Sequence, residues 1–234
     1  KKKIFLQNDC YSEIHHLQRN IHENDVIDLI DRLNSDDTIH GILIQLPLPP
    51  QINEQKVLNE VCLEKDVDGF HIKNIGKLTL NIEGDKLVPC TPDGILELLN
   101  RYRISISGKN VVIVGRSNIV GKPMALLMLN KNATVTICHS KTKNLKEHTK
   151  KADILIVACG KPNFIKRSDI KEDAVIIDVG INQIEDKSRK RGYRLVGDVD
   201  YEYCKDIVSA ITPVPGGVGP MTIAMLLKHT VDAF

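Results

Sequence analysis

The sequence lacks several features that would assign it to a particular class of protein. It has no apolar run near the ~18 residues that a membrane-spanning helix needs, and it shows no signal-peptide pattern, internal repeat or flexible linker. Acidic and basic residues nearly cancel, giving a net charge of +2. A nucleic-acid or membrane partner would therefore have to bind a local patch. No general bias of this kind is present, and we expect neither partner.

The cysteines lack the spacing of a metal site or a disulfide framework. The six residues are Cys10, Cys62, Cys90, Cys138, Cys159 and Cys204, with no C-x-x-C pair among them. Because they are far apart and mostly lie in apolar surroundings, reduced thiols inside a cell are favoured over disulfides or zinc. We expect a cytoplasmic protein without a metal. Organellar targeting stays open, because the chain opens on Lys1 without a methionine.

The first third of the chain predicts short strands and helices in alternation. At 234 residues and 42% hydrophobic content, one large or two modest globular domains are possible. The runs KIFLQ (3–7) and GILIQLP (41–47) have the composition of strands, and a helix between them has its apolar face at Val26, Ile27, Ile30 and Leu33. These segments predict a βαβ unit. A second helix is expected from Asn53, followed by a turn at KDVDGFH.

The central part of the chain predicts a parallel sheet. Thr91 and Pro92 are typical of an N-cap followed by the first helical residue, and they begin a helix that we expect to link two domains. Strands are predicted at 111–114, 134–138, 153–158 and 174–179, with a helix from residue 122. Such alternation indicates an α/β fold whose sheet is covered on both faces.

The stretch VVIVGRSNIVGKP carries an unusual glycine pattern. The dinucleotide fingerprint G-x-G-x-x-G would place glycines at 115, 117 and 120, but this chain has Gly115, Ser117 and Val120, with the next glycine at 121. The strand still leads directly into a helix start, where a phosphate can bind. A tight turn after any buried strand is the alternative interpretation of Gly115.

The second strand of this region ends without an acidic residue. An NAD site usually has Asp or Glu about 20 residues after the glycine loop, to bind the ribose 2′-hydroxyl. Here residues 139–143 are HSKTK, and Arg116 adds a guanidinium in the first loop. These donors suit a 2′-phosphate, so the pattern predicts NADP. Taken alone, residues 139–151 could also be a solvated basic face.

Taken together, the motifs resemble the bifunctional methylenetetrahydrofolate dehydrogenase/methenyltetrahydrofolate cyclohydrolases. The matching motifs are GILIQLPLP, KDVDGFH, PCTPDG, VGRSNIVGKP, CHSKT, VIIDVGIN, GDVD and ITPVPGGVGPMT. The resemblance implies oxidation of 5,10-methylenetetrahydrofolate with NADP, followed by hydrolysis of the methenyl product to 10-formyltetrahydrofolate. It also implies a Rossmann-like NADP domain at 91–212, a smaller α/β catalytic domain at 1–90 and 213–234 completed by the C-terminal helix, and a homodimer.

The resemblance assigns roles to residues that match the family's motifs. The cofactor contacts would be Gly115, Arg116, Ser117, Ser140 and Ile181. The folate site would be formed by Gln45, Asp68, Pro215, Gly216 and Gly219, with Gln45 orienting a catalytic lysine and Asp68 binding the pterin. From the residues alone, Gln45 could equally face water at a sheet edge, and Asp68 before Gly69 could be a turn residue.

One element of the family pattern is not found in its expected place. The family carries Tyr-x-x-x-Lys on a helix before the first strand, and the sequence is expected to begin just after that point. Tyr201 and Lys205 have the right spacing but lie in a different part of the chain, so we interpret them as unrelated. His71 is the nearest alternative acid/base residue by sequence, but a tight turn at 68–71 would point it away from Asp68.

Two other functions stay open at this stage. A non-catalytic paralogue could keep the folate and NADP sites without the lysine. A different two-domain NADP oxidoreductase, similar to shikimate dehydrogenase, is the other possibility, although the PVPGGVGPMT loop counts against it.

Overall fold

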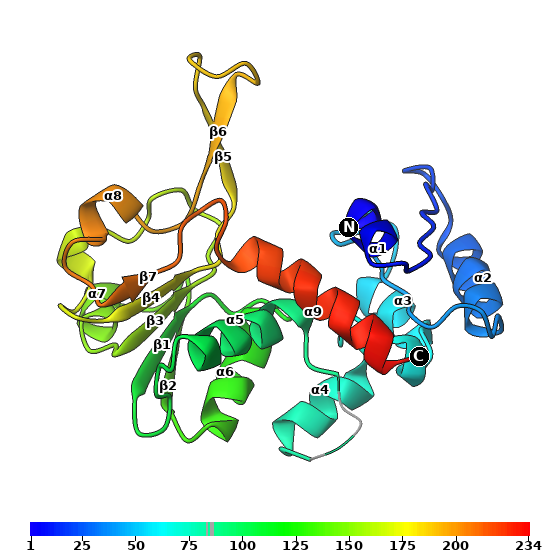
Figure 1. The fold of residues 1–234 in the computed structure, drawn as a ribbon, viewed down its shortest axis with the longest axis horizontal. Helices are drawn as coiled ribbons and strands as arrows, with labels where there is room; N and C mark the ends of the chain where they lie inside the picture. The colour runs from blue at the N-terminus through cyan, green and yellow to red at the C-terminus, as the bar shows by residue number, and fades with distance from the viewer. Residues whose placement is uncertain (83, 85–86) are drawn as a thin grey trace. The chain divides into compact units, whose positions relative to one another are not determined.

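The computed structural model describes residues 1–82, 84 and 87–234, and the chain divides into two compact units (Figure 1). The first unit contains Lys1–Cys90 and Ile223–Phe234, and the second contains Thr91–Thr222. The domain boundaries expected from the sequence were 90/91 and 212/213. In the structure, the first boundary also follows Cys90, but the second follows Thr222, within the last helix, α9 (Val218–Asp232).

A five-stranded parallel sheet forms the centre of the second unit. Its strands are β1 (Asn110–Val114), β2 (Thr134–Cys138), β3 (Ile154–Val157), β4 (Val175–Asp178) and β7 (Ala210–Ile211), in the order β2-β1-β3-β4-β7. The sequence predicted the parallel sheet and four of its strands but not β7. Val114, the last residue of β1, pairs with Cys138 on one side and Val157 on the other. The chain leaves β1 toward β2 and returns on the other side at β3, so the carboxyl ends of β1 and β3 flank the switch point.

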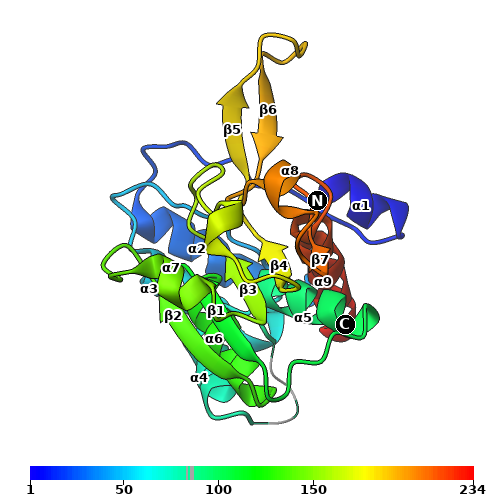
Figure 2. The ribbon, with the colours of Figure 1, turned by 90° about the vertical axis from the view of Figure 1, so that its left-hand side faces the viewer.

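Helices cover both faces of this sheet (Figures 1 and 2). On one side lie α5 (Cys90–Arg101) and α6 (Gly121–Asn130), and on the other lie α7 (Leu145–Thr149), the 3₁₀ turn η2 (Arg167–Asp169) and α8 (Tyr201–Cys204). Val112, Leu155 and Ile176 pack with Leu145 and Cys204 in one hydrophobic cluster. Since strands covered on both faces must be apolar throughout, the β-branched runs in the sequence account for this architecture.

An antiparallel hairpin was not predicted. It consists of β5 (Asn182–Glu185) and β6 (Tyr193–Val196) and projects from the second unit (Figures 1 and 2). Its strands read NQIE and YRLV, and none of their residues is buried. The mixed polar composition hides these strands from an analysis based on apolar runs.

The first unit contains helices joined by irregular segments. They are α1 (Lys2–Gln7), α2 (Glu23–Asn34), α3 (Glu54–Glu60), the 3₁₀ turn η1 (Leu63–Lys65) and α4 (Ile72–Thr79), with the later part of α9. Its core includes Val26, Ile30, Ile42, Ile52, Val57 and Val61. The helix expected from Asn53 is confirmed, and the Asn53 side chain caps it by accepting a hydrogen bond from the Lys56 amide.

The predicted βαβ unit at the start of the chain is wrong. Residues 3–7 lie in helix α1, because an apolar run this short fits one helical turn as well as a strand. Residues 41–47 form no strand. The Ile42 amide bonds the Lys65 carbonyl at 2.8 Å, but a single bond does not make a strand ladder. The described part of the chain contains no helix long and apolar enough to cross a membrane.

Candidate functional site

Two glycines bring the loop after β1 close to its neighbours. Gly115 has φ +137°, and a Cβ atom built on it would overlap the Ala158 carbonyl at the end of β3. A Cβ atom on Gly121 would overlap the Gly115 carbonyl. The second glycine of this loop is therefore needed where α6 begins, because the helix start packs directly on the loop backbone. This packing explains why position 121 is a glycine.

Ser117 shapes the entry to α6, and Arg116 stands outside it. The Ser117 hydroxyl accepts from the amides of Val120 and Gly121 at 3.2 and 3.3 Å. A hydroxyl that accepts these bonds keeps its own hydrogen to donate to an anion. Arg116 is exposed beside it. The two donors thus lie next to a helix N-terminus, an arrangement that binds phosphate.

A tight turn with Ser140 at its exposed tip follows β2. The His139 amide donates to the Thr142 hydroxyl at 2.9 Å, and the Thr142 amide donates back to the His139 carbonyl at 2.8 Å. The Gly115 amide bonds the Cys138 carbonyl at 2.9 Å, so the loop after β1 and this turn are adjacent. The structure therefore brings the predicted phosphate contacts together at the carboxyl edge of the sheet.

Ile181 follows β4 at the same edge and is 62% exposed. Its loop is held by two buried carboxylates, Asp178 and Asp198. Asp198 accepts hydrogen bonds from the amides of Cys159, Gly160 and Lys161 at 2.7 to 2.9 Å, and from the Asn182 side chain at 2.8 Å.

Asp178 completes this network. It accepts from the amides of Gly180, Asp198 and Val199 at 2.9 to 3.0 Å. Burial raises the pKa of Asp178 to about 6, although these three amides oppose the shift. The two carboxylates fix the loops after β3 and β4, and the sequence analysis missed both of them. Their occurrence directly after apolar strands, in VIID and VGD, was the available signal.

The loop before α9 carries the other predicted folate contacts of the second unit. Pro215 and Gly216 are exposed, and Gly216 has φ +106°. A Cβ atom on Gly219 would lie 3.8 Å from Cδ1 of Ile181. The structure thus brings the predicted contact to the nicotinamide end beside the predicted folate loop.

In the first unit, Gln45 is paired with a lysine. The Lys1 amine donates a 2.9 Å hydrogen bond to Oε1 of Gln45. The Gln45 amide donates to the Leu46 carbonyl at 3.1 Å, which leaves the oxygen facing Lys1. From the sequence, a lysine in this position was expected from a segment upstream, but in the structure it is Lys1. The run of three lysines at the start of the chain was the available signal.

Asp68 lies on the turn between η1 and α4 and is half-buried. Burial raises its pKa, while a hydrogen bond from Cys90 and the positive charge of Lys1 lower it. Asp66 fixes the turn, since it accepts from the His71 amide at 2.9 Å and the Asn74 side chain at 2.7 Å. Asp68 is therefore held near Lys1 in the first unit.

Two residues that the sequence analysis set aside have other partners. Nδ1 of His71 accepts from the Lys73 amide at 3.0 Å and caps α4. Lys205 follows α8 in the second unit, and its amine pairs with Glu202 at 2.6 Å. Neither arrangement suggests proton transfer to a substrate.

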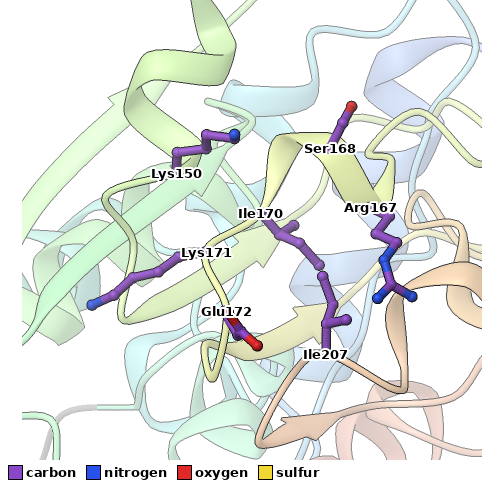
Figure 3. Close-up of a pocket in the computed structure, with 7 residues that line it drawn as sticks. All are labelled: Lys150, Arg167, Ser168, Ile170, Lys171, Glu172 and Ile207. Carbon is purple, nitrogen blue, oxygen red and sulfur yellow. The ribbon is translucent and has the colours of Figure 1, made fainter.

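A separate cavity of about 690 Å³ lies at the amino ends of β3, β4 and β7 (Figure 3). Ile170 and Ile207 point toward each other in it, and the remaining lining residues are Lys150, Arg167, Ser168, Lys171 and Glu172. Because Gly115 and Ile181 follow the opposite ends of the strands, this cavity is not part of the site described above.

Comparison with known proteins covers nearly the whole chain. Residues 89–234 match the model of the tetrahydrofolate dehydrogenase/cyclohydrolase NAD(P)-binding domain, and residues 1–68 match the model of the corresponding catalytic domain. The bifunctional protein FolD of Ligilactobacillus salivarius is 61% identical over 92% of this chain and 73% of its own length.

Solved structures agree with these matches. The bifunctional FolD enzyme of Campylobacter jejuni has a TM-score of 0.94 at 48% identity, over 99% of this chain and 80% of its own. The Trypanosoma brucei enzyme, solved with NADP and an inhibitor, has a TM-score of 0.95 at 38% identity, over 99% and 79%. The chain belongs to the tetrahydrofolate dehydrogenase/cyclohydrolase family.

Proposed function

We propose that this chain oxidises 5,10-methylenetetrahydrofolate with NADP and hydrolyses the product to 10-formyltetrahydrofolate. The observation that carries the proposal is the hydrogen bond from Lys1 to Gln45 beside Asp68, which supplies the amine that the hydrolytic step needs. Lys1, Gln45 and Asp68 of the first unit would act on the folate, and the second unit would hold the cofactor.

The carboxyl edge of the sheet fits a phosphorylated dinucleotide. Because Gly115 and Gly121 have no side chain, the loop after β1 packs closely on the end of β3 and on the start of α6. The turn at 139–142 carries no acidic side chain that would repel a 2′-phosphate. Arg116, Ser117 and Ser140 would bind phosphate groups, and Ile181 would contact the nicotinamide end. When bound, NADP supplies the nicotinamide that accepts a hydride from the methylene carbon of the folate.

The hydrolytic step requires a residue that both takes and gives a proton. Water adds to the methenyl carbon and loses a proton, and one carbon–nitrogen bond then breaks as its nitrogen is protonated. Lys1 would transfer these protons, with Gln45 fixing its amine, and Asp68 would accept hydrogen bonds from the pterin ring. A positioned acid/base residue contributes about 10²- to 10⁴-fold to such a step.

The other functions considered have less support. A non-catalytic paralogue was an alternative because no lysine was expected near Gln45, and Lys1 now occupies that position. A shikimate dehydrogenase-like enzyme does not fit the matches to both family domains.

A homodimer in the cytoplasm is part of the same proposal. Within the described residues, the hairpin strands β5 and β6 pair with each other and with no other strand, so each leaves one edge open to a second copy. The wide separation of the cysteines supports a reducing compartment. Sedimentation of the purified chain and imaging of a tagged copy would test these two points.

Two assays on the purified chain test the main proposal. Methylenetetrahydrofolate with NADP should yield NADPH, and methenyltetrahydrofolate alone should be hydrolysed. In the same assays, Asp68→Ala should raise the KM for the folate substrate and leave the KM for NADP unchanged. A wild-type chain that is folded, binds NADP and performs neither reaction would refute the assignment.

A further inference from the structure

The backbone carbonyl of Val67 accepts hydrogen bonds from two side chains that are distant in sequence. Nδ1 of His229, on α9, lies 3.0 Å from this oxygen, and Sγ of Cys90 donates to it at 3.3 Å. All three residues belong to the first unit and are buried. Because a carbonyl oxygen can only accept, Nδ1 of His229 carries the hydrogen.

This carbonyl belongs to the peptide group that leads into Asp68. The Val67 side chain is clamped as well, since a Cβ atom on Gly41 would lie 2.7 Å from its Cγ1. On the other side of the turn, Asp66 is fixed by the His71 amide and the Asn74 side chain. The peptide between Val67 and Asp68 is thus held from both sides. The side chains of His229 and Cys90 donate the two hydrogen bonds to its carbonyl oxygen.

We infer that His229 and Cys90 are positioning residues that set the orientation of Asp68 toward the folate. The inference rests on the proposed function, in which Asp68 accepts hydrogen bonds from the pterin. Cys90 also interacts with the Asp68 carboxylate and lowers its pKa, so the one thiol hydrogen of Cys90 is shared between the peptide and the carboxylate. Loss of either donor lets the 67–68 peptide rotate, which misaligns the carboxylate without removing it.

Paired substitutions separate this role from general stabilisation. His229→Leu and Cys90→Ala remove a donor, whereas His229→Asn and Cys90→Ser keep one near the same position. The dissociation constant of tetrahydrofolate is measured by titration for each variant. The dissociation constant of NADP and the melting temperature are measured alongside.

We expect the donor-removing variants to bind tetrahydrofolate about 5- to 10-fold more weakly, the effect of one lost hydrogen bond. The donor-keeping variants should bind it nearly as the wild type does, and NADP binding should be unchanged in all four. If His229→Leu does not fold, Cys90→Ala decides the question, because it removes the smaller side chain.

Two results would overturn the inference. One is wild-type tetrahydrofolate affinity in the folded donor-removing variants. The other is an equal loss of tetrahydrofolate and NADP binding in all four, which would indicate a structural role only. A wild-type chain that binds NADP but no tetrahydrofolate would instead refute the proposed function, and this inference with it.

Discussion

Cδ1 of Ile181 lies 3.8 Å from the position that a Cβ atom would take on Gly219. The two residues come from different segments of the second unit, since Ile181 follows β4 and Gly219 lies in the first turn of α9. The proposed contacts to the nicotinamide end and to the folate are therefore in van der Waals reach of each other. Hydride transfer requires this proximity, because donor and acceptor carbons must meet in one near-attack geometry.

Gly219→Val should lower the rate of hydride transfer. The branched side chain would meet Ile181 and displace it, and misplacement by about 1 Å can cost about 100-fold in rate. Gly219→Ala should be tolerated, because its Cβ atom makes only an ordinary contact. Single-turnover reduction of NADP measures the effect. Equal rates in both variants would show that Ile181 does not fix the nicotinamide end.

Lys1→Met should abolish most of the hydrolytic activity while the protein still binds NADP. The expected loss is about 10²- to 10⁴-fold in kcat for methenyltetrahydrofolate. Gln45→Leu should lower the same rate, and the double variant should lose little more, because both changes disable one unit. Lys3→Met, in helix α1, which begins directly after Lys1, is the matched control. Full hydrolysis by Lys1→Met would show that Lys1 does not transfer these protons.

Arg116→Ala should weaken NADP binding selectively. A charge-assisted hydrogen bond contributes about 1.5 to 3 kcal/mol, which corresponds to roughly 10- to 100-fold in the dissociation constant. NAD, which lacks the 2′-phosphate, should bind the variant as it binds the wild type. Lys131→Ala, just beyond the far end of α6, controls for a change in overall charge. Titration with both cofactors gives the answer, and equal losses would exclude a 2′-phosphate role for Arg116.

The raised pKa of Asp178 should make stability depend on pH. The folded chain binds this proton more tightly than the unfolded chain does, with a pKa of about 6 instead of 3.8. The stabilisation of the fold by protonated Asp178 is therefore fully present below about pH 3.8. It is lost as the pH rises to about 6, which lowers the free energy of unfolding by about 3 kcal/mol. The free energy of unfolding of the wild type, relative to Asp178→Asn, should fall over this range and then stay constant.

Asp186→Asn provides a control of opposite sign. Hydrogen bonds from Ser188 hold the pKa of Asp186 low, so its contribution is present above its unfolded pKa and is lost on acidification. Urea titrations at several pH values measure both differences. A flat difference for Asp178→Asn between pH 4 and 6 would contradict the assigned pKa.

The sequence was most informative where local pattern determines structure. The runs before Gly115, Cys159 and Val179 are apolar because their strands are buried on both faces, and these strands were predicted correctly. Residues 3–7 and 41–47 also contain short apolar runs, but their structure depends on neighbours that a sequence pattern does not reveal. A short apolar run is ambiguous between helix and strand until its tertiary partners are known.

In the candidate site, too, local features were predictable from the sequence and long-range contacts were not. The phosphate loop and the turn with Ser140 are local features, and their adjacency follows from parallel pairing of β1 and β2. The hydrogen bond from Lys1 to Gln45 joins residues 44 positions apart. The buried Asp198 gathers donors from residues 159–161 and 182. No periodicity encodes these contacts, so the sequence pattern marks the residues but does not show which of them are partners.

The first unit also has a consequence for how the chain folds during synthesis. His229 and Val67 are in contact although they are 162 positions apart, so the ribosome delivers one long before the other. At about 5 to 20 residues per second, the wait is roughly 10 to 30 seconds. The second unit, made of one continuous segment, can fold during that interval. During that interval the first unit lacks its last helix, so part of its apolar core is exposed. Chaperones that bind apolar surface are expected to bind the nascent chain at this stage.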